Sequence, residues 1–231
     1  MLEILDIGNT FTRIATWNGG RFTDLRRLPT EKLILNNMGV SRVAACVCPE
    51  VEERLNNSGI KFISAVNNFS KVDFSLVDTS TLGADRVANA IAAAEFYSLP
   101  VAVIDCGTAL TLEVVDEKRR FSGGAIAPGR MLLRQALAQG TAQLPDIPLT
   151  DSMPTEIGNN TADAIRFGVD AGAIGTVREW LRILRKKYPR LTVVIAGGDS
   201  RFFAAEIPDA MIADEYFTLH GIRLAASVSE T

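Results

Sequence analysis

The stretch ILDIGNT at residues 4–10 returns as VIDCGTA at residues 103–109, and the correspondence continues to Phe22 and Phe121. In both copies an apolar run ends in Asp-x-Gly and a second apolar stretch follows, which predicts a β-hairpin. Glycine lets the backbone approach a ligand, adjacent turn amides bind anions, and an aspartate at the strand end can hold a cation directly or through water. Two such hairpins facing each other would clamp a metal-bound polyphosphate.

Composition and charge limit the classes of protein to which the chain can belong. Its 231 residues are 47% hydrophobic, which is ample for a core, and the net charge of −3 gives no sign of a nucleic-acid partner. No apolar stretch is long enough to span a bilayer, and the N-terminus lacks the basic start and apolar core of a signal peptide. We therefore expect a soluble cytoplasmic protein without nucleic-acid or membrane partners. The repeat favours two domains, residues 1–99 and 100–231.

The three cysteines and the single histidine give little evidence of a site. Three cysteines do not make a disulfide framework, and Cys46 and Cys48 have no second pair to complete a zinc site of about four ligands. We interpret both as small residues of a buried strand, and Cys106 as a packing residue. For His220 a helix-surface or capping role is expected.

Hydrophobic periodicity and turn residues predict an α/β layered fold, with three strands opening each half. The expected strands cover residues 2–6, 11–17, 21–28, 42–47, 61–64, 101–105, 110–116, 120–127 and 191–196. The expected helices cover residues 30–37, 49–56, 83–97, 130–139, 161–187 and 215–227. Residues 141–160 are rich in Pro, Asp, Ser and Thr and are expected to form a loop over the site.

Three further glycine-containing segments are candidates for ligand binding. GADR at residues 83–86 gives a base and an anion anchor together, or its aspartate only compensates a helix dipole. FSGGAIAPG at residues 121–129 suits a helix N-terminus aimed at an anion, or is only a bulge and a helix entry. AGGD at residues 196–199 is either a nucleobase or ribose contact or a sharp turn. The Walker motif G-x-x-x-x-G-K-[ST] is absent from the sequence.

In this order, the segments resemble the type III pantothenate kinases over nearly the whole chain. The resemblance rests on Asp6-x-Gly8-Asn9-Thr10, Gly83-x-Asp85-Arg86, Asp105-x-Gly107-Thr108-Ala109, Gly123-Gly124-x-Ile126-x-Pro128-Gly129 and Asn160-Thr161. That family belongs to the acetate and sugar kinase, Hsp70 and actin superfamily, whose members place two ribonuclease-H-like domains around a nucleotide cleft. The resemblance implies transfer of the ATP γ-phosphoryl to pantothenate, which gives 4′-phosphopantothenate in the first step of coenzyme A biosynthesis.

The resemblance also implies a role for each site residue. Asp85 would be the general base, and Asp105 would ligate a monovalent cation, K+ or NH4+, while Mg²⁺ accompanies ATP. The residues expected to bind ATP are Asp6, Ile7, Gly8, Asn9, Thr10, Phe11, Thr12, Arg13 and Thr108. Those expected to line the pantothenate pocket are Leu76, Gly83, Ala84, Asp85, Arg86 and Thr161. Family members are homodimers, and the apolar, small-residue run at 164–174 suits such an interface.

Several positions depart from the family pattern. Arg13 stands where a lysine is frequent, and Leu110 and Glu113 stand where threonine and aspartate are common. Leu76 replaces a frequent tyrosine, which removes a hydroxyl contact or an aromatic wall from the pantothenate pocket.

Two alternatives to a pantothenate kinase stay open. One is a non-catalytic regulatory or ligand-sensing relative of the same fold; the other is a kinase or phosphohydrolase for another small molecule. Asp85 together with both Asp-x-Gly turns favours catalysis, and the segment at 83–86 together with Thr161 favours pantothenate.

Overall fold

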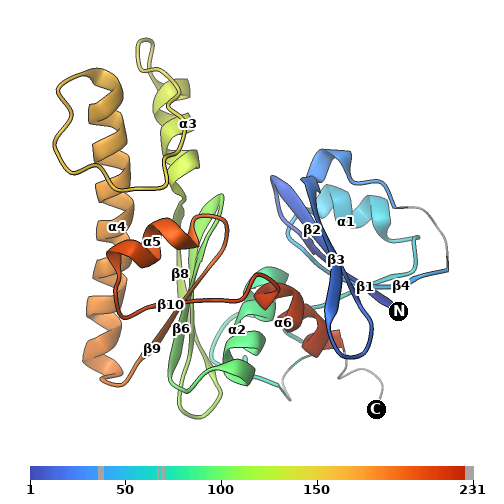
Figure 1. The fold of residues 1–231 in the computed structure, drawn as a ribbon. Helices are drawn as coiled ribbons and strands as arrows, with labels where there is room; N and C mark the ends of the chain where they lie inside the picture. Colours follow the sequence, from blue (N-terminus) through green and yellow to red (C-terminus); the bar gives the residue numbers. More distant parts are fainter. Residues whose placement is uncertain (36–38, 67, 69–70, 227–231) are drawn as a thin grey trace. The chain divides into compact units, whose positions relative to one another are not determined.

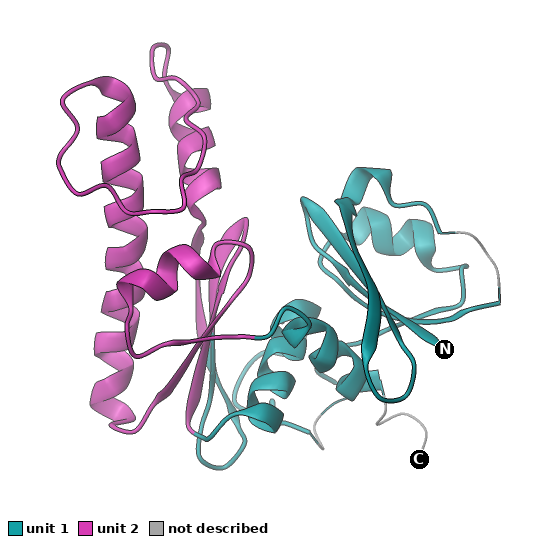
Figure 2. Ribbon diagram, viewed as in Figure 1, with its two compact units in different colours: residues 1–99, 113–123, 214–231 teal, residues 100–112, 124–213 magenta. Residues whose placement is uncertain are grey.

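The computed structural model describes residues 1–35, 39–66, 68 and 71–226 (Figure 1). The chain forms two compact units, of which unit 1 holds residues 1–99, 113–123 and 214–231 and unit 2 holds residues 100–112 and 124–213 (Figure 2). The predicted domains and the observed compact units share one boundary, between Leu99 and Pro100. The division into homologous domains at 1–99 and 100–231 stays a prediction, since the compact units add two later segments to the first.

The first sheet is built from the strands of the first hairpin and its neighbours. It has the order β3-β2-β1-β4-β5 and consists of β1 (Leu2–Ile7), β2 (Phe11–Trp17), β3 (Phe22–Pro29), β4 (Ser41–Cys46) and β5 (Ile60–Phe62). β2 runs antiparallel to β1 and β3, while β4 runs parallel to β1 and β5. Successive side chains of a strand point to opposite faces of the sheet. In β2, Ile14 is accordingly buried on one face, while Arg13 stays partly exposed on the other.

The second sheet repeats this arrangement. It consists of β6 (Val101–Cys106), β7 (Ala109–Val115), β8 (Phe121–Pro128), β9 (Thr192–Ala196) and β10 (Met211–Ile212), in the order β10-β9-β6-β7-β8. β9 is parallel to β6 and to β10, and the two-residue link between β6 and β7 makes that pair antiparallel. Phe22 and Phe121 begin the third strand of each sheet. The α/β class predicted from hydrophobic periodicity, with the two ribonuclease-H-like sheets that the resemblance implies, is confirmed.

Two helices of unit 1 pack tightly on each other. They are α2 (Ala84–Phe96) and α6 (Phe217–Ala226), while α1 (Pro49–Leu55) packs against β4. Alanine lets backbones approach closely, and a Cβ on Gly221 would collide with the carbonyl of Ala88. Between the helices the buried Thr218 hydroxyl donates to Asn89 Oδ1 at 2.9 Å. This packing fixes α2, whose first turn carries the GADR segment.

The helices of unit 2 are α3 (Arg130–Gly140), α4 (Thr161–Lys187) and α5 (Ser200–Glu206). α4 has the predicted bounds, because the Asn160 side chain caps it by accepting from Asp163 N at 3.0 Å. The positive charges of residues 185–187 in its last turn interact favourably with the negative end of the helix dipole. α3 and α4 lie side by side (Figure 1), and Ile147 of the following loop packs with Ile165 and Val169 of α4.

Some sequence expectations were wrong. In place of a helix over 30–37 there is one 3-10 turn, Thr30–Lys32, because the Thr30 hydroxyl is bonded to Gly8 and Leu33 is buried beside the sheet; residues 36–37 lie outside the described residues. α5 and β10 were not predicted, because seven and two residues are too short to show a hydrophobic period.

The thiols and the histidine are mostly structural. Cys46 ends β4 with a pKa raised by burial to about 11, Cys106 is buried as expected, and Cys48 lies beyond the strand at the start of α1. His220 is half-buried on α6, with its ring 4.7 Å from that of Phe22, so a plain surface role is wrong. Burial lowers the pKa of His220. In the described part of the chain, no helix has the length and apolarity to cross a membrane.

Candidate active site

The tip of the first hairpin is held on two sides. Gly8 N donates to the carbonyl of Phe11 at 3.1 Å, which closes the turn between β1 and β2. The Thr30 hydroxyl donates to the carbonyl of Gly8 at 2.7 Å from the end of β3. Asn9 at the tip is exposed. The turn therefore presents its backbone in one geometry, as an anion-binding turn needs.

Two of the predicted ATP-binding residues have buried side chains. Ile7 is 1% exposed, and Thr12 is fully buried with its hydroxyl 3.1 Å from the hydroxyl of Thr30. Any contact that Ile7 or Thr12 makes with a nucleotide is therefore made through the backbone. Asp6, Thr10 and Phe11 are partly exposed and keep side chains within reach of a ligand.

Arg13 clamps the aspartate of its own hairpin. Its Nε and Nη2 lie 3.1 and 2.9 Å from Asp6 Oδ2, and its Nη1 donates to the carbonyl of Glu215 at 3.2 Å. The two side chains are 28% and 18% exposed. The guanidinium thus neutralises Asp6, which lowers the repulsion that this carboxylate would exert on a phosphate.

The GADR segment sits at the N-terminus of α2. Gly83 is the residue before the helix, and Asp85 Oδ1 accepts from the backbone N of Arg86 at 2.7 Å. A Cβ at position 83 would lie 2.7 Å from Asp85 Oδ1, so a larger residue there would displace the carboxylate. Asp85 is half-buried. A carboxylate held in this way is oriented by the helix start and still accessible to a substrate.

Arg86 is oriented by a buried acid. Its Nε donates to Glu113 Oε1 at 2.9 Å, and the Glu113 side chain is fully buried whereas that of Arg86 is 15% exposed. The guanidinium carbon lies 5.8 Å from the centre of the Phe121 ring. Glu113 of β7 therefore pairs with the charge of Arg86 and fixes its guanidinium group beside Asp85.

The second hairpin turn meets the start of α3. Gly107 N donates to the carbonyl of Ala109 at 3.0 Å, and Gly129 N donates to the carbonyl of Thr108 at 2.9 Å. A Cβ on Gly129 would collide with the carbonyl oxygens of Gly107 and Thr108. Gly129 is therefore needed for the close approach of the start of α3 to the Thr108 turn.

A third turn closes on the same point. Gly197 has φ +88° and a Cβ there would collide with the Asp105 carboxylate and the Cys106 carbonyl. Asp199 N donates to the carbonyl of Cys106 at 3.0 Å. The turns at 105–108, 128–129 and 197–199 thus form one cluster in unit 2, which we call the Asp105 cluster.

The donor set at the Asp105 cluster suits a hard cation. A carboxylate and neighbouring carbonyl oxygens are ligands that such ions prefer. The described residues contain no group of three or more His, Cys, Asp or Glu side chains that could hold a metal ion. Mg²⁺ usually binds through one or two carboxylates plus substrate phosphates, so the residues fit an ion that arrives with a polyphosphate.

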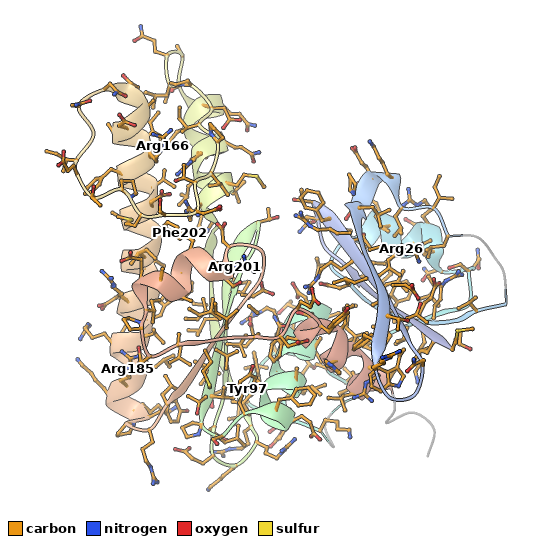
Figure 3. All side chains as sticks on the ribbon, in the orientation of Figure 1. Arg26, Tyr97, Arg166, Arg185, Arg201 and Phe202 are labelled. Atoms are coloured by element: carbon orange, nitrogen blue, oxygen red, sulfur yellow. The ribbon has the colours of Figure 1, made fainter. Side chains whose placement is uncertain are left out.

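The two remaining predicted pocket residues lie in different units. Leu76 of unit 1 is 53% exposed. Thr161 of unit 2 is exposed as the first residue of α4. Near it, a cavity of about 350 Å³ is lined by loop residues and by Arg166 (Figure 3), which donates to Asp163 Oδ1 at 2.6 Å.

Sequence reasoning missed several supporting residues. Thr30 belongs to no motif, and no signal in the sequence indicates its bond to Gly8. Glu113 stands in the returning strand of the second copy, where an acid amid apolar residues signals a buried partner. The same signal applies to Asp170 in the apolar run of α4, which pairs with Arg130 and Arg134.

Comparison with known proteins gives a consistent answer. A family model described as type III pantothenate kinase matches residues 2–182. A type III pantothenate kinase of Thermosipho africanus is 31% identical and the match covers 96% of both chains. One of Bacteroides fragilis is 30% identical over 95% of this chain and 94% of its own.

Solved structures share the fold at low sequence identity. A protein of Campylobacter jejuni named for the Baf family of transcriptional activators matches with a TM-score of 0.67 at 18% identity, over 97% of both chains. A Sinorhizobium meliloti protein named as a 2-dehydro-3-deoxygalactonokinase matches with a TM-score of 0.63 at 10% identity, over 100% of this chain and 97% of its own. These likenesses support the fold alone.

Proposed function

Because this chain belongs to the type III pantothenate kinase family and phosphorylates pantothenate, we propose that Asp85 is the general base of the reaction. The observation that carries this role is the carboxylate held at the start of α2, with Gly83 leaving room for it and Arg86 beside it. A base must come within hydrogen-bonding distance of the proton it takes, and a half-buried group on a rigid helix start meets that need. Asp85 would accept the proton of the pantothenate primary hydroxyl as the phosphoryl group is transferred.

The two hairpins are proposed to hold the phosphates of ATP. Phosphoryl transfer depends on in-line positioning and charge neutralisation more than on covalent chemistry. The turn at 8–10 and the Thr108 turn are proposed to contact the phosphates through their backbone, and Arg13 neutralises Asp6. Preorganised donors of this kind stabilise charge without reorganisation during the reaction.

The segment at 83–86 is proposed to line the pantothenate pocket together with Leu76 and Thr161. Pantothenate is an anion at neutral pH, and Arg86 offers a guanidinium that Glu113 already orients. A fixed guanidinium recognises a carboxylate by paired hydrogen bonds. Leu76 supplies an apolar wall in place of a hydroxyl, and Thr161 supplies a hydroxyl at the start of α4.

A coupled ADP-release assay tests the substrate assignment. The purified protein should release ADP from ATP and Mg²⁺ when pantothenate is added, and not when acetate or a hexose replaces it. Turnover with a sugar alone would move the protein to another kinase of the superfamily. ATP binding without turnover of any of these would favour the non-catalytic regulatory alternative.

The second copy of the hairpin predicts a dependence on a monovalent cation. Leu112 stands in the repeat at the position of Arg13, so the side chain at this position is apolar in the second hairpin. A carboxylate at Asp105 would repel ATP phosphates, and K+ or NH4+ held by Asp105 and nearby carbonyls would remove that repulsion.

Activity is therefore expected to fall when K+ is replaced by a bulky organic cation such as tetramethylammonium. Asp105→Asn should remove the response to K+, because the amide carries no charge to hold the cation, and should remove most activity with it, because the bound cation also bridges the protein to the nucleotide. Rates are measured at constant ionic strength. Equal rates in the two salts would contradict a cation at Asp105.

We also propose a homodimer that uses α4. Gly168, Gly172 and Gly175 lie on the exposed surface of this 27-residue helix, with nothing within 4 Å of a Cβ placed at any of them. Glycine in a helix interior costs roughly 1 kcal/mol relative to alanine, and close helix approach is a reason to keep it. The same face carries Ala164, which extends the stripe toward Thr161.

Gly172→Glu is expected to convert a dimer to a monomer without unfolding the chain, since the site has space in the subunit. Light scattering at micromolar concentration measures the mass. Gly140→Glu is the matched control, because Gly140 is exposed at the end of α3 and a Cβ there also meets nothing within 4 Å. A monomeric wild type with full activity would refute the dimer.

The proposed setting is the cytoplasm, without nucleic-acid or membrane partners. The net charge of −3 offers no electrostatic attraction to nucleic acid or to an anionic lipid surface. ATP and pantothenate are small polar substrates that suit such a setting.

A further inference from the structure

Arg130, the first residue of α3, has a fully buried side chain. Its Nε and Nη2 donate to the two oxygens of Asp170 at 2.9 and 3.2 Å, in the paired geometry that fixes a guanidinium plane. Its Nη2 also donates to the carbonyl of Thr150 at 2.8 Å. The guanidinium carbon lies 3.4 Å from the ring centre of Phe202, which projects from α5 (Figure 3).

The remaining nitrogen of Arg130 faces the Asp105 cluster. Nη1 lies 3.4 Å from Asp199 Oδ2, longer than a good hydrogen bond, and it has no other hydrogen-bond partner in the described structure. Burial raises the pKa of Asp199, and the Arg130 charge opposes that rise. Asp199 in turn holds the carbonyl of Cys106 through its backbone N.

Arg130 is also tied to the cluster through its own chain. The residue before it, Gly129, donates to the carbonyl of Thr108 and has no room for a Cβ. Arg130 therefore reaches the turn at 105–108 by two routes, one through Gly129 and one through Asp199. The buried Asp170 sets the guanidinium plane and so fixes both routes.

We propose that Arg130 is a positioning residue for ATP, which holds the Thr108 turn and the turn at 197–199 in register with each other. This inference rests on the proposed function, in which the Thr108 turn binds the nucleotide. A turn that must place backbone N–H groups on a phosphate tolerates little displacement, and misplacement of about 1 Å can cost roughly 100-fold in rate.

Arg134 offers a matched comparison within the same core. Its side chain is 1% exposed, its Nη2 donates to Asp170 Oδ1 at 2.7 Å, and its Nη1 donates to the carbonyls of Ile147 and Pro148 in the loop after α3. Arg130 and Arg134 therefore share charge, burial and partner. They differ in that Arg130 faces Asp199 and Phe202, while the Arg134 guanidinium donates to backbone carbonyls of the loop after α3.

The test compares Arg130→Lys with Arg134→Lys in the full chain. Each keeps the charge and loses the planar fork. Arg130→Lys is expected to raise the KM for ATP, and the Kd for ADP measured by calorimetry, by roughly 10-fold to 100-fold, with the KM for pantothenate unchanged. Arg134→Lys is expected to lower thermal stability about as much as Arg130→Lys does. It should leave the KM for ATP within about twofold of wild type, because the carbonyls to which Arg134 donates belong to the loop.

A purely structural role for Arg130 predicts that both variants change nucleotide affinity alike, or that neither does, and either result overturns the inference. Should Arg130→Lys fail to fold, Asp199→Asn replaces it, since this partly exposed side chain tolerates an isosteric change. Asp199→Asn should raise the KM for ATP in the same direction, and an unchanged value overturns the inference. A wild-type protein that binds ADP but does not phosphorylate pantothenate would contradict the proposed function and leave the role of Arg130 in nucleotide binding intact. A wild type that binds no nucleotide would overturn both.

Discussion

Asp85→Asn is expected to lower kcat by roughly 10²–10⁴-fold, the usual cost of removing a positioned base. Asparagine has nearly the same shape and can still accept from Arg86 N, as Asp85 Oδ1 does at 2.7 Å. The helix start should therefore persist, and the KM for ATP should change little. Steady-state rates together with far-ultraviolet circular dichroism would separate a loss of chemistry from a loss of fold.

A control is needed because an acid in the first turn of a helix also favours the helix dipole. Glu50 occupies the first turn of α1 and has no place in the proposed site. Glu50→Gln removes the same type of dipole interaction, worth about 0.3–1 kcal/mol, and should leave kcat unchanged. A wild-type rate in Asp85→Asn would show that Asp85 only supports the start of α2.

The repeated hairpin could be predicted because it is local. Residues 4–10 and 103–109 carry the turn glycine and the strand-end aspartate within a few positions, so the hairpins follow from short-range rules. The strands joined by short links, β1-β2-β3 and β6-β7-β8, are neighbours in their sheets for the same reason. The long helix α4 could also be predicted from local signals, since Asn160 caps its start and basic residues lie in its last turn.

Most of what holds the site in place is non-local and was not predictable from one sequence. The bond between Thr30 and Gly8 spans 22 positions, the pair Arg86 and Glu113 spans 27, and the pair Arg130 and Asp170 spans 40. Each joins two elements whose contact is known only from the fold. The sequence shows the charged residues in apolar surroundings but not which of them meet.

Asp170→Asn is expected to destabilise the protein by roughly 3–5 kcal/mol, the range for breaking a buried ion pair. Asp170 is fully buried between Arg130 and Arg134, so its loss removes the carboxylate that the two guanidinium groups share and leaves Arg130 only its 3.4 Å ionic contact with Asp199. Urea unfolding at neutral pH measures the change. Asp209→Asn, which removes an exposed partner of Arg185, should cost less than about 1 kcal/mol, and an equal loss in the two variants would contradict the assignment of Asp170 as the core anchor.

Replacing the whole triad separates stability from positioning. Apolar residues of similar volume often restore or exceed the stability of a buried ion-pair cluster, so Arg130→Met, Arg134→Met and Asp170→Leu together should unfold at a higher urea concentration than Asp170→Asn alone. Methionine at 130 has no charge to face Asp199, whose carboxylate lies 3.4 Å from Arg130 Nη1. A stable triple variant with weak nucleotide binding would therefore show that the cluster is kept for the geometry of the Thr108 turn, whereas wild-type nucleotide binding would reduce it to a replaceable piece of core.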